Sequence, residues 1–182
     1  YVAALKKDPH YADALWNMGN AIFRKYCSNK ITDWFTALEY YEYRFHRSGT
    51  AVKLRASQDL LEWDGVTRVP HLIVLAEQGF GDQIMFARFL AEAKSRVDRL
   101  TVQCEPRMAP IYEPEYEVCY KETVGTHAVA MCSLPLTMRV PLCDGRFLAH
   151  KLVRKVPNGE LDVGVTWSGS KTHVNNAYRS TT

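Results

Sequence analysis

The chain has 182 residues, of which 47% are hydrophobic and 24% are charged, and its formal net charge at pH 7 is +3. This length can bury the core of one domain and a small companion, which is typical of a globular protein. The small net charge and the scattered basic residues argue against a nucleic-acid partner. No apolar run approaches the roughly 20 residues that span a bilayer, and the first residues lack a signal-peptide pattern.

The cysteines indicate neither a zinc site nor a disulfide framework, because their number is odd and no two of them are spaced C-x-x-C. Reduced thiols in a cytoplasmic protein are the simplest interpretation. The five cysteines are Cys27, Cys104, Cys119, Cys132 and Cys143.

Residues 1–46 are predicted to be helical. A first helix over residues 8–22 places the small residues Ala14 and Gly19 where two helices would approach closely, and residues 34–41 supply a second helix. This pattern resembles a tetratricopeptide repeat, a helical pair that can recruit a protein partner. One repeat cannot bury a solenoid core alone, so we expect further repeats before it. The alternative is a plain helical hairpin packed on the next domain.

Residues 47–69 are polar and lack a sustained period, so we interpret them as a connector. Strand-like and helix-like runs then alternate over residues 70–158. The runs at 71–76, 99–104 and 127–132 are the strand candidates. This alternation predicts an α/β fold with a parallel sheet and right-handed crossovers.

A glycine-containing loop follows the first of these strands and ends at Asp82. The loop therefore lies at the carboxyl end of a strand, where open α/β sheets bind ligands. Gly79 and Gly81 would permit a tight turn and a close approach of a ligand to the backbone. The run that follows repeats apolar residues near the 3.6-residue period of a packed helix. Its apolar members are Ile84, Met85, Phe86, Phe89, Leu90, Ala93 and Val97.

The polar residues of this loop each have two interpretations. Asp82 could take a proton from a bound hydroxyl group, or it could cap the helix by accepting free N–H groups at its start. Glu77 and Gln78 could donate and accept hydrogen bonds with ligand hydroxyls, or they could satisfy the backbone of the loop.

A second polar loop falls in residues 159–182, after a β-branched and aromatic run at 161–167. It contains Lys171, His173 and Arg179. Backbone N–H groups, hydroxyls and fixed cations are the groups that bind a diphosphate. His173 could contact this ligand or could be a hydrogen-bonding loop residue.

Several short motifs occur in an order and spacing that resemble one family. They are Trp63-Asp-Gly65, Glu77-Gln-Gly-Phe-Gly-Asp82, Phe86-Ala-Arg88, Gln103-Cys-Glu-Pro106, Ser133-Leu-Pro135, and Trp167-Ser-Gly169 with His173 and Arg179-Ser180. Together they are similar to the heptosyltransferase-like glycosyltransferases of GT-B fold (glycosyltransferase family 9) that carry tetratricopeptide repeats on their N-terminal side.

The resemblance implies an inverting glycosyltransferase that uses neither a metal ion nor a cofactor. Its substrates would be a nucleotide-sugar donor and a glycan, lipid-linked or protein acceptor. Residues 70–158 would form the Rossmann-like acceptor-side domain and residues 159–182 the first strand and loop of an incomplete donor-side domain, so we expect this piece alone to be inactive. Asp82 would be the general base. The implied acceptor-binding residues are Glu77, Gln78, Gly79 and Gly81. The implied donor-binding residues are Thr166, Ser168, Ser170, Lys171, His173, Arg179 and Ser180.

Two other functions remain open. The chain could be an interaction module whose α/β domain is catalytically idle, or a Rossmann-like nucleotide-binding enzyme of another class. The second is poorly supported, because the sequence has neither a phosphate-loop motif nor a full G-x-G-x-x-G. No D-x-D motif is present to bind a nucleotide-sugar through a metal ion. The alternating Glu113, Glu115 and Glu117 fit a solvated loop better than a metal site.

Overall fold

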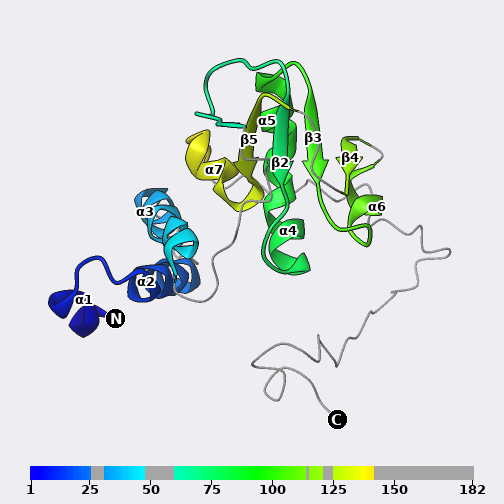
Figure 1. Cartoon of the computed structure of the whole chain (residues 1–182). Coiled ribbons are helices and arrows are strands. Elements are labelled where there is room, and N and C mark those ends of the chain that lie inside the picture. The colour runs from blue at the N-terminus through cyan, green and yellow to red at the C-terminus, as the bar shows by residue number, and fades with distance from the viewer. Residues whose placement is uncertain (26–30, 48–59, 114, 121–124, 142–182) are drawn as a thin grey trace, which may run out of the picture. The chain divides into compact units, whose positions relative to one another are not determined.

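The computed structural model describes residues 1–25, 31–47, 60–113, 115–120 and 125–141 (Figure 1). The described residues all belong to one unit of the chain, residues 1–147. The predicted strand at 161–167 and the second polar loop lie outside the described residues.

The centre of the fold is a five-stranded parallel sheet in the order β1-β5-β2-β3-β4. The mixed α/β fold and the parallel sheet predicted from the sequence are thus confirmed. In Figure 1 the arrowheads of β2, β3 and β5 point the same way. The strands are β1 (Leu61–Glu62), β2 (Leu72–Leu75), β3 (Leu100–Gln103), β4 (Glu117–Cys119) and β5 (His127–Ala130).

The three predicted strands correspond to β2, β3 and β5, whereas β1 and β4 were missed. The connector interpretation is wrong at β1, which pairs with β5 through Leu61 and Glu62. The interpretation of Glu117 as part of a loop is also wrong, because it lies in β4 opposite Thr101. Both strands are short edge strands without an apolar run. Pairing with a neighbour defines them, and the local sequence does not show it.

The helix predicted after β2 is present but divided into α4 (Phe80–Phe86), a 3₁₀ turn η3 (Ala87–Phe89) and α5 (Leu90–Arg96). Ile84 and Met85 were expected in the packed face, and this is wrong, because they are 39% and 44% exposed. The buried face instead runs through Gln83, Phe86 and Leu90, which are spaced three and four residues apart. Ile84 and Met85 fall to the side of that stripe.

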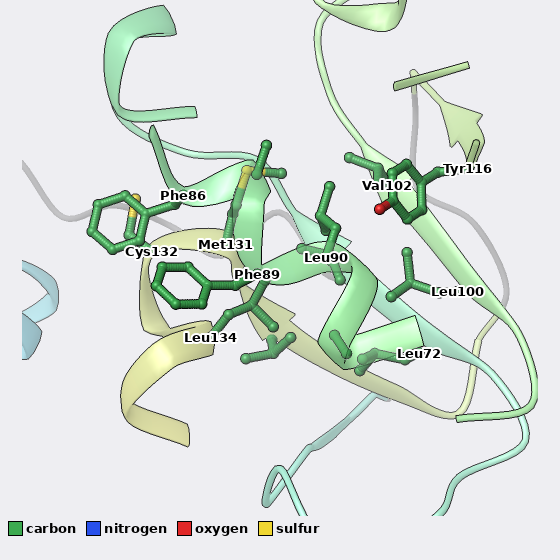
Figure 2. Close-up of a cluster of buried hydrophobic side chains, with 14 of the residues drawn as sticks. Leu72, Phe86, Phe89, Leu90, Leu100, Val102, Tyr116, Met131, Cys132 and Leu134 are labelled. Atoms are coloured by element: carbon green, nitrogen blue, oxygen red, sulfur yellow. The ribbon is translucent and has the colours of Figure 1, made fainter. Parts of the chain in front are cut away.

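The main core lies between these helices and one face of the sheet. Figure 2 shows Phe86, Phe89 and Leu90 from the α4–η3–α5 segment, Leu72 from β2, and side chains from the segment that follows β5. That segment contains η4 (Met131–Ser133) and α7 (Leu134–Thr137). A short helix, α6 (Ala109–Tyr112), follows β3 and adds Tyr112 to the same cluster.

The N-terminal residues form α1 (Val2–Lys7), α2 (Ala12–Lys25), α3 (Ile31–Tyr41) and a 3₁₀ helix, η2 (Glu42–His46). The close approach predicted at Gly19 is confirmed, because a Cβ there would lie 2.8 Å from the Ala37 carbonyl oxygen and 2.9 Å from the Tyr41 nitrogen. Trp34, Leu38 and Tyr41 of α3 belong to the same buried cluster as the sheet. The helical segment is therefore packed on the α/β core.

We predict that Gly19→Ala destabilises the fold by about 1–3 kcal/mol, because the added methyl group meets the backbone of α3 and not a flexible side chain. Gly81→Ala is the matched control. Gly81 lies in α4 with no atom within 4 Å of an added Cβ, so alanine there should be neutral or stabilise by up to about 1 kcal/mol. Urea denaturation measures both changes. Equal stabilisation by the two substitutions would show that α2 and α3 are not in close contact.

Candidate functional site

The candidate site lies at the carboxyl ends of β2 and β5. The chain leaves β2 toward β3 on one side, whereas β5 pairs with the other side of β2, so the strand order reverses between these two strands. Open α/β sheets bind ligands at such a reversal point. Two segments begin at these strand ends: residues 76–79 follow β2, and η4 follows β5.

The guanidinium group of Arg44, from η2, binds both segments. Arg44 Nε donates to Glu77 Oε2 at 3.0 Å, and Arg44 Nη2 donates to Glu77 Oε1 at 2.6 Å. The two side chains are only 1% and 4% exposed. This is a buried, bidentate, charge-assisted pair, which is the strongest arrangement that these two side chains form.

The other N–H groups of Arg44 also have acceptors. Nη1 donates to Glu42 Oε1 at 2.6 Å and to the Tyr41 carbonyl oxygen at 3.3 Å, and Nη2 donates to Ser133 Oγ at 2.7 Å. Ser133 Oγ in turn donates to the Glu42 carboxylate, 2.9 Å from Oε2. A guanidinium has five N–H donors, and each of the five can be assigned an acceptor here. The group is therefore fully satisfied despite its burial.

Burial by itself lowers the pKa of Arg44, but the hydrogen bonds and negative charges of Glu77 and Glu42 outweigh it and hold the pKa above its usual value. The guanidinium is consequently charged at every ordinary pH. Removing one partner of such a pair leaves an uncompensated buried charge and costs about 3–5 kcal/mol. Arg44 thus connects the helical segment to both strand ends.

Sequence reasoning missed Arg44 and named Ser133 only as part of a motif. The one local signal is that Arg44 is a charged residue within the aromatic run Tyr40-Tyr41-Glu42-Tyr43-Arg44-Phe45. Its guanidinium carbon lies 4.1 Å from the centre of the Phe45 ring and 4.7 Å from that of Tyr41. An arginine that must be buried is well suited to such surroundings, because aromatic faces attract cations.

Asp82 occupies the first turn of α4, beside this network. Its Oδ2 accepts a hydrogen bond from the Gly79 N–H at 3.2 Å, so the helix-capping interpretation is present in the structure. The side chain is partly exposed. Among the residues that the structure describes, no second hydrogen bond to the Asp82 carboxylate is present. Capping therefore leaves Oδ1 available to another donor.

The turn before Asp82 depends on Gln78 and not on the glycines. Gln78 has a φ of 61°, in the left-handed region, whereas Gly79 has a φ of −77° and Gly81 lies inside α4. The prediction that Gly79 and Gly81 permit the tight turn is therefore wrong. Gln78 Nε2 donates to Glu77 Oε2 at 3.3 Å, and the Gln78 carbonyl accepts from Gln83 Nε2 at 3.5 Å. These contacts hold a backbone conformation that a non-glycine residue rarely adopts.

Two further ionisable groups lie beside the network, and burial raises the pKa of both. These are Tyr41 and Cys132, and in each the negative charges of Glu77 and Asp82 raise the pKa further while Arg44 opposes them. Both groups are thus protonated at neutral pH, and a protonated, buried thiol is a poor nucleophile. Of the two acids in the loop after β2 and the first turn of α4, Asp82 is the more accessible, because Glu77 is buried and paired with Arg44.

The remaining polar groups complete the site. Gln83 is only 4% exposed, and its Oε1 has no hydrogen-bond partner among the described residues. Arg88, also in a motif of the resemblance, donates to the Met85 carbonyl oxygen at 2.8 Å. No group of three or more His, Cys, Asp or Glu side chains in the described ranges could hold a metal ion.

The sequence-predicted residues are brought together only in part. Glu77, Gln78, Gly79, Gly81 and Asp82 lie in or beside one loop at the end of β2. The predicted donor-binding residues, Thr166, Ser168, Ser170, Lys171, His173, Arg179 and Ser180, lie outside the described residues.

In the part of the chain that the structure covers, no helix is both long and apolar enough to cross a membrane.

The chain was compared with protein-family models, with curated proteins and with solved structures, and none of these comparisons found a match.

We predict that Gln78→Gly stabilises the fold by about 1 kcal/mol, because glycine adopts a φ of 61° without the steric cost that glutamine bears. Gln78→Ala is the control. It also removes the side-chain contact with Glu77 but keeps the Cβ atom, so it should bring no gain. Chemical denaturation of the two variants decides the matter, and equal stability of glycine and alanine at this position would mean that the turn is unstrained.

Proposed function

We propose that this chain is part of a metal-independent, inverting glycosyltransferase of GT-B type in which Asp82 is the general base. The observation that supports the proposal is the contrast between the two carboxylates that follow β2, one in the loop and one in the first turn of α4. Glu77 is buried and bound through both oxygens by Arg44, whereas Asp82 is partly exposed and accepts a single hydrogen bond from Gly79 among the described residues. A general base must reach the proton that it removes, and Asp82 meets this requirement.

The reaction would proceed as a single displacement. The acceptor oxygen forms a bond to the anomeric carbon of the sugar on the face opposite the phosphate. The bond between that carbon and the phosphate oxygen breaks, and its electron pair leaves with the nucleoside diphosphate. The acceptor proton passes to Asp82. No metal ion is needed if protein cations neutralise the diphosphate, and Lys171 and Arg179 of the second polar loop are the proposed cations.

The acceptor would lie over the loop between β2 and α4. Gln78 in this loop and Gly81 at the start of α4 are both exposed, and no atom lies within 4 Å of a Cβ added at Gly81. Glu77 was expected either to bind the acceptor or to satisfy the backbone of the loop. Since Arg44 engages both of its oxygens, we assign Glu77 neither role in the proposal and treat it as the partner of Arg44.

A second candidate is an interaction module with a catalytically idle α/β domain. The specific observation in its favour is that Arg44 fills the position at the ends of β2 and β5 where ligands of open α/β sheets bind. In that account α2 and α3, as a tetratricopeptide-like hairpin, would recruit the partner. Asp82 would then serve only as the cap of α4.

We predict that Asp82→Asn lowers turnover in the full-length protein by roughly 10² to 10⁴, the usual contribution of general acid–base catalysis. Asparagine keeps the shape of the side chain and can still accept the Gly79 N–H, so folding and donor affinity should change little. Transfer from a panel of nucleotide-sugars measures the turnover.

Asp64→Asn is the matched control for this experiment. Asp64 also accepts backbone N–H groups, from Val66 and Thr67 at 2.9 and 2.7 Å, but it is exposed and belongs to the loop after β1. Its substitution should leave turnover unchanged. A loss of less than about threefold in Asp82→Asn would favour the capping role and the second candidate function.

A further inference from the structure

We propose that Arg44 is a positioning residue for Asp82, which the helical segment supplies to the loop of the α/β core. This inference rests on the proposed function for its catalytic meaning, but the physical connection that it describes is independent of any substrate. Arg44 forms no hydrogen bond or ion pair with Asp82; its bonded side-chain partners are Glu77, Glu42 and Ser133. It acts through Glu77, Gln78 and Gly79.

The connection runs through contacts of consecutive residues. Arg44 holds the Glu77 carboxylate through two hydrogen bonds. Gln78 Nε2 donates to the same carboxylate, at Oε2. The left-handed φ of Gln78 directs the chain into Gly79, and the Gly79 N–H then donates to Asp82 Oδ2. The orientation of the Gly79 N–H therefore depends on the backbone at Gln78, which follows the carboxylate that Arg44 holds.

The turn needs such an anchor, because a glutamine in the left-handed region is an unfavourable local conformation. Without an anchor, the backbone at Gln78 would relax toward the more populated region with negative φ. The Gly79 N–H would then turn away from Asp82. A bidentate pair between an arginine and a buried carboxylate is strong enough to oppose this relaxation.

A purely structural role for Arg44 is the competing explanation, since it also joins the helical segment to the core. Arg139 provides the comparison. Its Nη1 lies 3.3 Å from Glu39 Oε1 of α3, so this pair joins the same two parts of the chain without touching the loop. If joining them were all that mattered, Arg139→Lys would also weaken the Asp82 contact, although by less than Arg44→Lys. The effect would be smaller because the Arg139 and Glu39 side chains are 65% and 56% exposed and water screens their pair.

The test is the pH dependence of the Gly79 amide proton signal, followed by NMR in the ligand-free protein. An amide proton that is bonded to a carboxylate shifts when that carboxylate takes up a proton, so the size of the shift reports how much of the bond is present. Comparison with Asp82→Asn identifies the part of the Gly79 shift that protonation of Asp82 causes. The amide of Leu72, which donates to the Arg99 carbonyl within the sheet, shows over which pH range the fold stays intact.

We expect Arg44→Lys to reduce the Asp82-dependent shift of Gly79 on the order of twofold or more, because a single ammonium cannot form the fork that holds Glu77. Arg139→Lys should leave the shift unchanged. Adding Gln78→Gly to Arg44→Lys should restore part of it, since glycine adopts the turn without an anchor. A role limited to joining the two parts would not be rescued in this way.

A second variant covers the possibility that Arg44→Lys fails to fold. Arg44→Met combined with Glu77→Leu removes both buried charges together, so no unpaired charge remains at position 77. It should lose the shift as Arg44→Lys does. A full Gly79 shift in either variant would overturn the proposal. If the shift behaves as expected but no sugar transfer is found with any donor, the positioning of Asp82 stands and the proposed function fails.

Discussion

The contact between the helical segment and the strand ends depends on one constraint: the buried guanidinium of Arg44 needs an acceptor for each of its five N–H groups. Arg44 leaves water completely, and the loss of hydration would be prohibitive if any of its donors were left unpaired. Its acceptors come from three places in the chain: the junction of α3 and η2, the end of β2 and the end of β5. The helical segment, the loop before α4 and the η4 turn must therefore all be in place before the group is satisfied.

This constraint lies at the point of the sheet where function is expected. Parallel strands expose their carboxyl ends at one edge, and the reversal of order between β2 and β5 makes that edge accessible. Here Arg44 and Glu77 form a buried ion pair at this edge. Asp82 remains on the exposed side. In this way one carboxylate supports the structure, and the other is left for chemistry in the proposed glycosyltransferase.

The strands with apolar runs were predictable from sequence, because Leu72–Leu75 and Leu100–Gln103 carry their pairing signal in their own side chains. The position of Asp82 at the start of a helix was predictable for the same local reason. The role of Arg44 was not, because its acceptors at Glu77 and Ser133 are 33 and 89 residues away. The left-handed turn was assigned to the glycines, since propensity favours them there. Anchoring of Glu77 places Gln78 in it instead, and no pattern in the sequence shows that anchor.

The coupling free energy between Arg44 and Glu77 tests the central claim most directly. It is obtained from a double-mutant cycle in which Arg44→Met, Glu77→Leu and the combination are unfolded with urea. If the pair ties the helical segment to the strand ends, each single variant should lose about 3–5 kcal/mol, and the combination should lose much less than their sum, a coupling of about 2 kcal/mol or more. Additive losses, with a coupling near zero, would contradict the account.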